Sequence, residues 1–327
     1  MRPRLAGHRN LPLERPGGLL GLLGILPQAR VAQLLDWVLG GGAQAWPRGR
    51  PAVEEDAPFF LGMPHLGADG LSVSWLLREC GHVHWRAVAE ITGVEPGQLT
   101  DRFGNRAFAS VVSCRVEGRP EAFGEEDRVR FVPVLRPAPE TGWRSRTALV
   151  AESGARIDVE LVTLFARRER AGSARLVRAE MDPALLADDT GPKSARARLM
   201  RGEARAAHGA AQADAAPAHL SIPISSALHY NAVLLCYYAN LSIYFQECEG
   251  LVLAQGAQTL PLLRMRIDCF GSLDDEEMLD LVSVPSVAAI APTPRVVIRS
   301  HARRRSDGAV VATCETVRGY EDDEAPV

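Results

Sequence analysis

Apolar residues recur at intervals of three and four along residues 71–92 of this chain. The stripe comprises Leu71, Trp75, Leu76, Val83 and Val88. This spacing places them on one face of a helix, so the segment predicts a long helix with one buried side. Gly93, with Pro96 beyond it, is a usual helix stop signal, so we expect the helix to end there.

Strand-like runs follow this helix, and in one of them apolar and polar residues alternate. The runs are residues 108–117, 129–135, 147–152, 156–167 and 176–181, and residues 52–63 before the helix also have an extended pattern. Alternation at residues 156–167 predicts a sheet with one covered face. One helix followed by several antiparallel strands predicts an α+β fold.

The same order then starts again. A short extended piece at residues 220–225 precedes a second apolar helix, predicted at residues 230–250. The strand-like runs after it are residues 251–254, 260–270, 279–284, 295–302 and 309–317. The Gly-containing turn at residues 306–308 predicts a hairpin between the last two runs.

The two helices also carry similar short stretches, RECG at residues 78–81 and QECEG at residues 246–250. Glu79 and Glu247 lie 168 positions apart (247 − 79), which suggests a tandem duplicate. Chance similarity of two amphipathic helices is the alternative. A duplicate predicts a tandem (double) hot-dog fold, with two antiparallel sheets each wrapped around a long central helix.

The expected domain boundaries follow from this repeat. Residues 1–50 form a leader with a short helix, residues 51–190 the first hot-dog domain, and residues 191–217 a connecting helix and linker. Residues 218–320 form the second hot-dog domain, and residues 321–327 an acidic tail.

Composition narrows the class of protein. The 327 residues favour two domains, and the net charge of −3 gives no case for nucleic acid. None of the six cysteines forms C-x-x-C or has zinc spacing with histidine, so we expect reduced, mostly buried thiols in a cytoplasmic protein and no metal. The apolar run at residues 232–245 is too short to span a membrane, and the glycine-broken run near the N-terminus is a poor signal peptide.

Several catalytic signatures are absent from the sequence. There is no G-x-S-x-G, no Walker A motif and no G-x-G-x-x-G. These absences argue against an α/β-hydrolase, a P-loop NTPase and a dinucleotide enzyme.

The remaining candidates lie at the entrances of the two helices. The first entrance has His65, Asp69, Gly70 and Ser72, and the second has Ser226, His229 and Asn231. Free N–H groups at a helix start can hold a thioester carbonyl as its oxygen gains negative charge, and an Asn side chain can donate to the same oxygen. His or Asp could move a proton. The plainer interpretation is that Asp69, Ser72 and Asn231 are N-caps and His65 is a turn residue.

Other polar residues on the helices have mainly structural interpretations. His82 and His84 are two apart and face different ways, so packing or exposure is expected for both. Glu79 and Glu247 need partners if buried, or lie on an exposed edge.

The stretch GMPHLGADGLSVSWLLRECGHVHW (residues 62–85) closely resembles the signature helix of biosynthesis-cluster proteins related to the leinamycin-pathway bifunctional acyltransferase/decarboxylase. HYNAVLLCYYANLSIYFQECE (residues 229–249) resembles the second helix of that family, and the resemblance covers most of residues 55–320. It implies a double hot-dog fold and acyl thioesters of coenzyme A or an acyl carrier protein. The characterised branch decarboxylates methylmalonyl-CoA and delivers propionyl to a carrier protein.

That family has a proposed acylated tyrosine at the start of the strand after the first helix. Our register places Phe108 there. Phenylalanine has no nucleophilic oxygen, so a tyrosyl acyl-enzyme is excluded by this register. The chain would then decarboxylate or transfer directly, perform different thioester chemistry, or only bind.

The sequence therefore predicts an enzyme of polyketide-type specialised metabolism that acts as an acyltransferase or decarboxylase. Asn231 and backbone N–H groups near Gly70 would hold the thioester oxygen, His65 or His229 would protonate the carbanion, and Asp69, Ser72 and Phe108 would contact substrate. No cofactor is expected beyond the coenzyme A or phosphopantetheine of the substrate. Expected partners are acyl-CoA and an acyl carrier protein, with no nucleic acid or membrane, and a homodimer is left open.

Two alternatives stay open. One is a non-catalytic hot-dog protein that docks a carrier protein or pathway enzyme. The other is a dehydratase or thioesterase of hot-dog type, which needs a carboxylate such as Asp69, or a histidine, facing the thioester.

Overall fold

The computed structural model describes residues 57–138, 142–170, 175–182, 217–231, 233, 235–254, 260–288 and 295–320. The predicted leader, the connecting helix with most of its linker, and the acidic tail lie outside the described residues. The described segments belong to one compact unit, which runs from residue 50 onward.

The first long helix, α3 (Val73–Thr92), lies close to its predicted position. Ser72 caps its N-terminus, because the Ser72 Oγ accepts a hydrogen bond from the Trp75 N–H at 3.3 Å. Gly93 ends the helix in the left-handed conformation at φ 68°, and its N–H donates to the Ala89 carbonyl. Both the helix and its stop signal were therefore predicted from sequence.

The second long helix, α6 (Tyr238–Leu253), begins and ends later than predicted. The described residues between the one-turn helix α5 (Ser226–His229) and α6, namely 230, 231, 233 and 235–237, are instead not helical. The Asn231 side chain accepts hydrogen bonds from the Val233 and Leu235 N–H groups, which competes with helix formation there. At the other end, residues 251–253 were predicted as a strand and are helical, so that prediction was wrong.

The remaining elements follow the predicted order. The first half contains β1 (Phe59–Phe60), η1 (Met63–His65), β2 (Leu66–Gly67), β3 (Gly70–Leu71), η2 (Pro96–Gln98), β4 (Phe108–Gly118), η3 (Pro120–Ala122), β5 (Arg128–Ala138), β6 (Gly142–Ala151), β7 (Arg156–Arg168) and β8 (Leu176–Arg178). The second half contains β9 (Ala218–Pro223), β10 (Leu262–Cys269), β11 (Met278–Ala288), β12 (Arg295–Arg304) and β13 (Val310–Arg318). The predicted turn at residues 306–308 joins β12 to β13 as an antiparallel hairpin.

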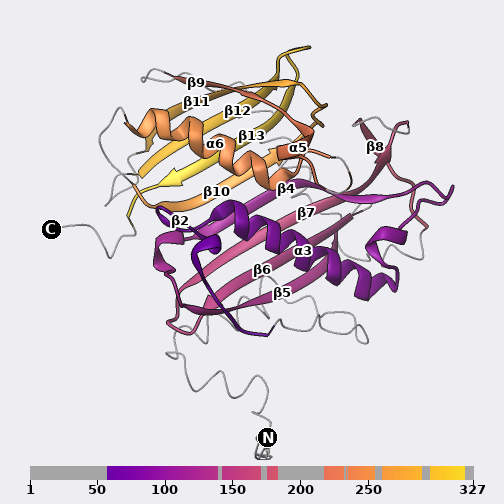
Figure 1. The fold of residues 1–327 in the computed structure, drawn as a ribbon, viewed down its shortest axis with the longest axis horizontal. Coiled ribbons are helices and arrows are strands. Elements are labelled where there is room, and N and C mark those ends of the chain that lie inside the picture. Colours follow the sequence, from indigo (N-terminus) through magenta and orange to yellow (C-terminus); the bar gives the residue numbers. More distant parts are fainter. Residues whose placement is uncertain are drawn as a thin grey trace, which may run out of the picture. The chain divides into compact units, whose positions relative to one another are not determined.

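The strands form one continuous antiparallel sheet, where two separate sheets were predicted. Its order is β1-β5-β6-β7-β4-β10-β13-β12-β11-β9, with β8 beside β7, and β2 and β3 form a small separate pair. The two halves join where β4 pairs with β10. Figure 1 shows both long helices in front of this sheet, each over its own half.

The two halves repeat specific contacts. The backbone of Leu61 exchanges hydrogen bonds with the Glu126–Asp127 turn, and that of Ile224 does so with the Glu276–Glu277 turn. Glu126 and Glu276 have positive φ angles of 69° and 62°. Histidine–aromatic contacts repeat as well, between His65 and Trp75 and between His229 and Tyr244. These repeated contacts support a tandem duplication.

Burial along the two helices repeats at the spacing of 168 inferred from sequence. Leu76, Leu77 and Cys80 of α3 are buried, and so are the α6 residues 168 positions further on, Tyr244, Phe245 and Cys248. Gly81 lies where α3 crosses the start of α6, and a Cβ there would lie 2.9 Å from the hydroxyls of Tyr237 and Tyr238. The absence of a side chain at Gly81 therefore leaves room for these two hydroxyls, which donate hydrogen bonds to the Arg78 and Leu77 carbonyls of α3.

The main core lies between the helices and the sheet and includes buried Leu76, Leu77, Phe245 and Met265. A second apolar cluster, with Trp143 and Phe165, packs under the C-terminal half of α3. All six cysteines are free and four are buried, as expected for reduced thiols. None of the helices in the described part of the chain is long and apolar enough to cross a membrane.

Candidate functional site

A cavity opens where the two halves of the sheet separate. β4 and β10 pair only through residues 113–117 and 264–268. On β4 the pairing with β7 continues to Phe108, with an irregularity between Val111 and Ser113, so this end of β4 leaves β10. The cavity in the resulting gap has a volume of about 1110 Å³, which is large enough for an extended small-molecule ligand.

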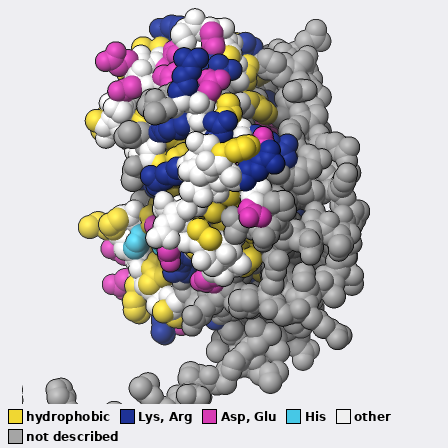
Figure 2. All heavy atoms as spheres, turned by 90° about the vertical axis from the view of Figure 1, so that its right-hand side faces the viewer, with side chains coloured by type: hydrophobic (Ala, Val, Ile, Leu, Met, Phe, Trp, Pro, Cys, Tyr) yellow, Lys and Arg dark blue, Asp and Glu magenta, His cyan; other side chains and the backbone are white. Residues whose placement is uncertain are grey.

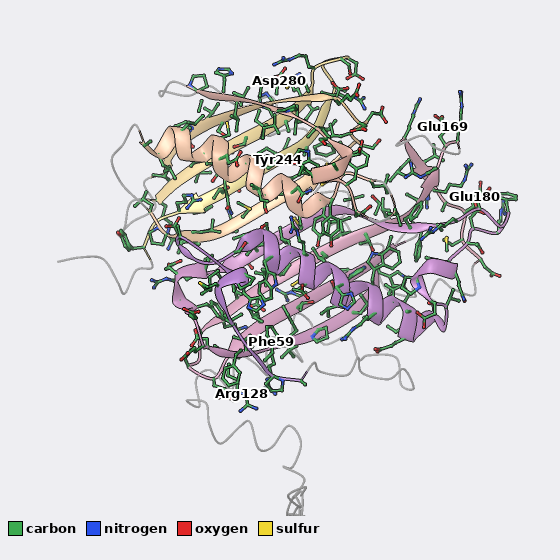
Figure 3. All side chains as sticks on the ribbon, viewed as in Figure 1. Phe59, Arg128, Glu169, Glu180, Tyr244 and Asp280 are labelled. Carbon is green, nitrogen blue, oxygen red and sulfur yellow. The ribbon has the colours of Figure 1, made fainter. Side chains whose placement is uncertain are left out.

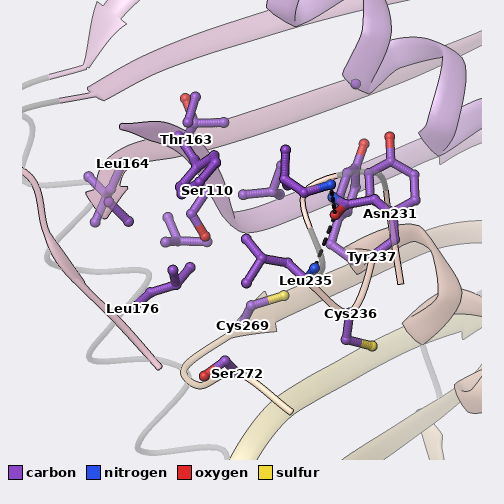
Figure 4. Close-up of a pocket in the computed structure, with 18 of the residues that line it drawn as sticks. Ser110, Thr163, Leu164, Leu176, Asn231, Leu235, Cys236, Tyr237, Cys269 and Ser272 are labelled. Carbon is purple, nitrogen blue, oxygen red and sulfur yellow. Dashed lines mark hydrogen bonds between the residues drawn. The ribbon is translucent and has the colours of Figure 1, made fainter. Parts of the chain in front are cut away.

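Residues from both halves line this cavity. The first half contributes the middle of α3, the start of β4, the end of β7, and β8, and the second half contributes the loop before α6 and the loop after β10. Figure 4 shows Ser110, Thr163 and Leu176 facing Cys269 and Ser272 across the space, with Asn231 and Tyr237 at one end. The cavity exists only because the halves are joined through β4 and β10.

Asn231 is held rigidly in the wall of the cavity. Its Oδ1 accepts from the Val233 and Leu235 N–H groups, each at 3.1 Å, and its own N–H donates to the Leu235 carbonyl at 2.9 Å (Figure 4). Arg168 further fixes this loop, because it donates to the Val233 carbonyl at 2.6 Å. The Asn231 Nδ2 has no acceptor among the described residues, so it is the part of this side chain that remains to donate to a ligand.

Phe108 supplies an apolar part of the wall. It begins β4 opposite Ala166 of β7 and is 9% exposed. The Arg106 guanidinium lies over its ring, 5.4 Å from the centroid, which is a cation–π contact. Phe108 therefore gives the cavity wall an aromatic ring with the positive charge of Arg106 beside it. It does not supply a nucleophile.

His84 is a buried, neutral part of the cavity floor. Its Nε2 lies 3.0 Å from the Thr163 Oγ1 and its Nδ1 2.8 Å from the Ser145 Oγ. Thr163 donates to the Trp143 carbonyl at 3.2 Å, so its oxygen is left to accept from Nε2–H, and Nδ1 accepts from Ser145. Burial lowers the pKa of His84 to about 4, and both ring nitrogens are already used.

His82 differs from His84 in both exposure and bonding. It lines the cavity from an exposed position on α3, and no described residue hydrogen-bonds to its ring. The different orientations of these two histidines were predicted from their spacing. The contribution of both to one cavity was missed, because the sequence gives no sign that β4 and β10 separate beneath them.

The two thiols and two phenols in the lining stay protonated at neutral pH. Burial raises the pKa of Tyr238 well above its usual value. Burial raises the pKa values of Cys236, Cys269 and Tyr237 to about 12 each. A nucleophilic cysteine requires its thiolate, so neither of these two thiols is suited to covalent catalysis.

The first helix entrance does not form a comparable cavity wall. Gly70 has φ 94°, and a Cβ there would lie 2.6 Å from the Glu121 Cα and closer still to the Pro120 carbonyl, so η3 covers this glycine. Ser72 is occupied as the N-cap of α3, and Asp69 is exposed in the turn between β2 and β3. None of these three residues lines the cavity.

His65 and His229, the two predicted catalytic histidines, each accept a hydrogen bond from a nearby backbone N–H. The His65 Nδ1 accepts from the Gly62 N–H at 2.7 Å, and its ring packs on Trp75. The His229 Nδ1 accepts from the Ser225 N–H at 2.9 Å, and burial lowers the pKa of His229. Neither histidine lines the cavity. Of the seven predicted site residues, only Phe108 and Asn231 meet there.

Glu79 and Glu247, which the sequence singled out, have no hydrogen bonds to described side chains. Glu247 is exposed and Glu79 is half-buried. A different glutamate of α6, Glu249, is fully buried. Glu249 accepts from the Thr316 hydroxyl and pairs with Arg318 at 3.4 Å. Burial raises its pKa despite these partners. This group lies within the second half and does not line the cavity. No cluster of three or more His, Cys, Asp or Glu residues in the described part of the chain could hold a metal ion.

Comparison with known sequences finds no match: no family model and no curated protein corresponds to this chain. Solved structures do match. A 12:0-ACP thioesterase from Umbellularia californica shares 11% identity at a TM-score of 0.54, over 80% of this chain and 92% of that chain. A putative oleoyl thioesterase from Lactobacillus plantarum shares 7% sequence identity at a TM-score of 0.57, and the match covers 80% of this chain and 94% of that chain. An acyl-ACP thioesterase from Bacteroides thetaiotaomicron shares 9% sequence identity at a TM-score of 0.54, and the match covers 80% of this chain and 96% of that chain.

The chain has a hot-dog-like fold. The likeness spans nearly the whole of each matched structure, and it agrees with the repeated helix-and-sheet halves described above. At these identities the comparison concerns the fold, and function must be argued from the cavity itself.

Proposed function

We propose that this protein binds an acyl thioester in the cavity between β4 and β10 and hydrolyses it. The observation that carries the proposal is the Asn231 side chain, which is fixed in the cavity wall with its Nδ2 left to donate. The surrounding lining contains Phe108, Leu164 and Leu235, which suits an acyl chain. The fold shared with three thioesterases is consistent with this substrate class.

In this mechanism the thioester carbonyl oxygen accepts a hydrogen bond from the Asn231 Nδ2. When water attacks the carbonyl carbon, the oxygen gains negative charge and the hydrogen bond strengthens. Because two backbone N–H groups already hold the Asn231 Oδ1, the amide need not reorient during the reaction. The bond to sulfur then breaks, which releases a carboxylic acid and a free thiol.

His82 is the proposed base that removes a proton from the attacking water. It is the lining histidine whose ring nitrogens have no described partner, whereas both nitrogens of His84 are engaged. The displaced proton passes to the departing thiolate. General-base catalysis of this kind contributes roughly 10²–10⁴-fold to a rate.

Decarboxylation with acyl transfer is the second candidate, and the resemblance of residues 62–85 to the leinamycin-pathway family favours it. The same Asn231 donor would stabilise the enolate left when carbon dioxide departs from a malonyl-type thioester. Phe108 offers no oxygen for a tyrosyl intermediate, so transfer would have to be direct. A role in specialised metabolism and an acyl carrier protein partner belong to this candidate.

The test is incubation of the purified protein with malonyl, methylmalonyl and straight-chain acyl thioesters of coenzyme A and of a carrier protein, followed by mass spectrometry and a thiol reagent. We expect free thiol and free acid to appear. Loss of carbon dioxide with the thioester intact would establish the second candidate instead. A thioester that binds but stays unchanged across the series would refute both and leave a docking protein.

Substitution of the proposed groups sharpens this test. Asn231→Ala should lower kcat by roughly 10²-fold, which is typical for loss of one oxyanion donor. His82→Gln should lower kcat by roughly 10²–10⁴-fold, as expected for loss of a general base. His219→Gln changes an exposed histidine on β9 and should leave kcat unchanged. If Asn231→Ala retains full activity, the proposed oxyanion role is wrong.

A further inference from the structure

Positive charge is concentrated in the lining of the cavity. The lining includes Arg86, Arg106, Arg175, Arg178 and Arg304, against two carboxylates, Asp274 and Asp307. The formal charge of these lining residues is +3 (5 − 2), and Glu169, which pairs with Arg175 from outside the lining, reduces it to +2 (3 − 1). Figure 2 shows arginine side chains gathered on one face of the molecule. A lining of this sign favours an anionic ligand.

Arg106 is the arginine best placed to meet such a ligand. Arg304 is bound by Asp307 at 2.6 Å and Arg175 is paired with Glu169 at 3.6 Å. Arg106 is exposed and contacts the Phe108 ring, and it has no carboxylate partner in the described part of the chain. The ring contact holds the guanidinium at the cavity, where it can present its donors to a phosphate.

Aromatic surface accompanies these arginines. Phe270, directly after β10, is 46% exposed and lines the same cavity, and Trp85 on α3 is half-buried in the lining. An exposed ring beside guanidinium groups suits a nucleotide, because a base can stack on the ring while its phosphates meet the cations.

We infer that the arginine-rich lining binds the 3′-phosphoadenosine diphosphate of coenzyme A, so that free coenzyme A thioesters are the substrates in preference to thioesters on a carrier protein. The inference rests on the proposed function. The positive groups line the cavity itself, where a nucleotide can enter, whereas a folded carrier protein would stay outside and present only its pantetheine arm and one phosphodiester.

Calorimetric titration of the protein with coenzyme A, 3′-dephospho-coenzyme A and pantetheine tests this inference without requiring turnover. We expect coenzyme A to bind tightest, with an affinity that falls as salt is raised. Arg106→Ala should weaken coenzyme A binding by about tenfold, as expected for loss of one charge-assisted contact, and should leave pantetheine binding unchanged. Arg106→Lys should restore part of the loss.

Arg128→Ala is the matched control, because Arg128 is an exposed arginine on β5 that pairs with Glu152 and does not line the cavity. It should bind coenzyme A as wild type does. Circular dichroism checks that each variant is folded. Equal binding of pantetheine and coenzyme A to wild type, or an equal loss of both in Arg106→Ala, would overturn the inference.

The same design separates this inference from the proposed function. Phosphate-dependent binding with no hydrolysis would refute the proposed function alone. Hydrolysis of acyl-pantetheine as fast as acyl-CoA would refute the coenzyme A inference alone.

Discussion

Acid should destabilise this protein through His84, because the folded state resists protonating that ring. His84 is 1% exposed and bonded through both ring nitrogens, and burial lowers its pKa from 6.5 to about 4. As pH falls below 6.5 the unfolded chain takes up a proton at this residue, while the folded chain does so only near pH 4. The unfolded state then binds more protons, so the free energy of unfolding falls between these two pH values.

The size of the effect follows from the two pKa values. Their difference, at about 1.36 kcal/mol per pKa unit, corresponds to about 3.4 kcal/mol lost by the time the pH is well below 4. Between pH 7 and pH 5 the same linkage gives a loss of about 2 kcal/mol. This is a substantial part of the 5–15 kcal/mol (roughly) that stabilises a typical domain.

Urea unfolding at pH 7 and pH 5 measures this directly in wild type and in His84→Gln, which cannot titrate. The variant should lose about 1 kcal/mol at pH 7 from weakened hydrogen bonding, yet should show a drop from pH 7 to pH 5 that is smaller by about 2 kcal/mol. Groups common to both proteins cancel in this comparison. His219→Gln controls for removal of one histidine. An equal pH dependence in wild type and His84→Gln would refute the reasoning.

Four glycine substitutions, arranged as two pairs of a test and its control, probe the packing around the two helices. Gly81→Ala should be less favourable than Gly250→Ala by about 1 kcal/mol or more, because its Cβ would displace two tyrosine hydroxyls at 2.9 Å that hydrogen-bond to the Arg78 and Leu77 carbonyls. Gly250→Ala changes an exposed glycine of α6, meets no atom within 4 Å and should be neutral or stabilising by about 0.5–1 kcal/mol. Thermal melting that ranks the two variants alike would contradict the proposed contact of Gly81 with the tyrosines. Gly70→Ala should cost more than about 2 kcal/mol in urea unfolding, because it combines positive φ with overlap on Pro120. Gly93 also has positive φ (68°) but open space around it, so Gly93→Ala measures the cost of the backbone conformation alone. An equal loss of stability in Gly70→Ala and Gly93→Ala would show that η3 moves away to accommodate the new methyl group at residue 70.

The local features of this chain follow from its sequence. Period-three-and-four apolar spacing and a terminal glycine determine α3, because a helix needs one buried face and a residue that tolerates positive φ at its end. The order of helix and strands, given twice, was also sufficient to predict the duplicated hot-dog-like halves. The start of α6 was placed too early, because the pattern does not reveal that Asn231 would use its side chain on loop N–H groups.

The site was decided by tertiary structure. Whether two half-sheets stay separate or join depends on backbone hydrogen bonding between β4 and β10, which leaves no periodic signal in either strand. That junction opens the cavity, brings Phe108 from one half to Asn231 from the other, and adds His82, His84 and Arg106. The first helix entrance looked equally suitable in sequence, but η3 packs on Gly70 and covers it. Residue type and spacing therefore determined the two halves, and only their packing determined which entrance became a cavity.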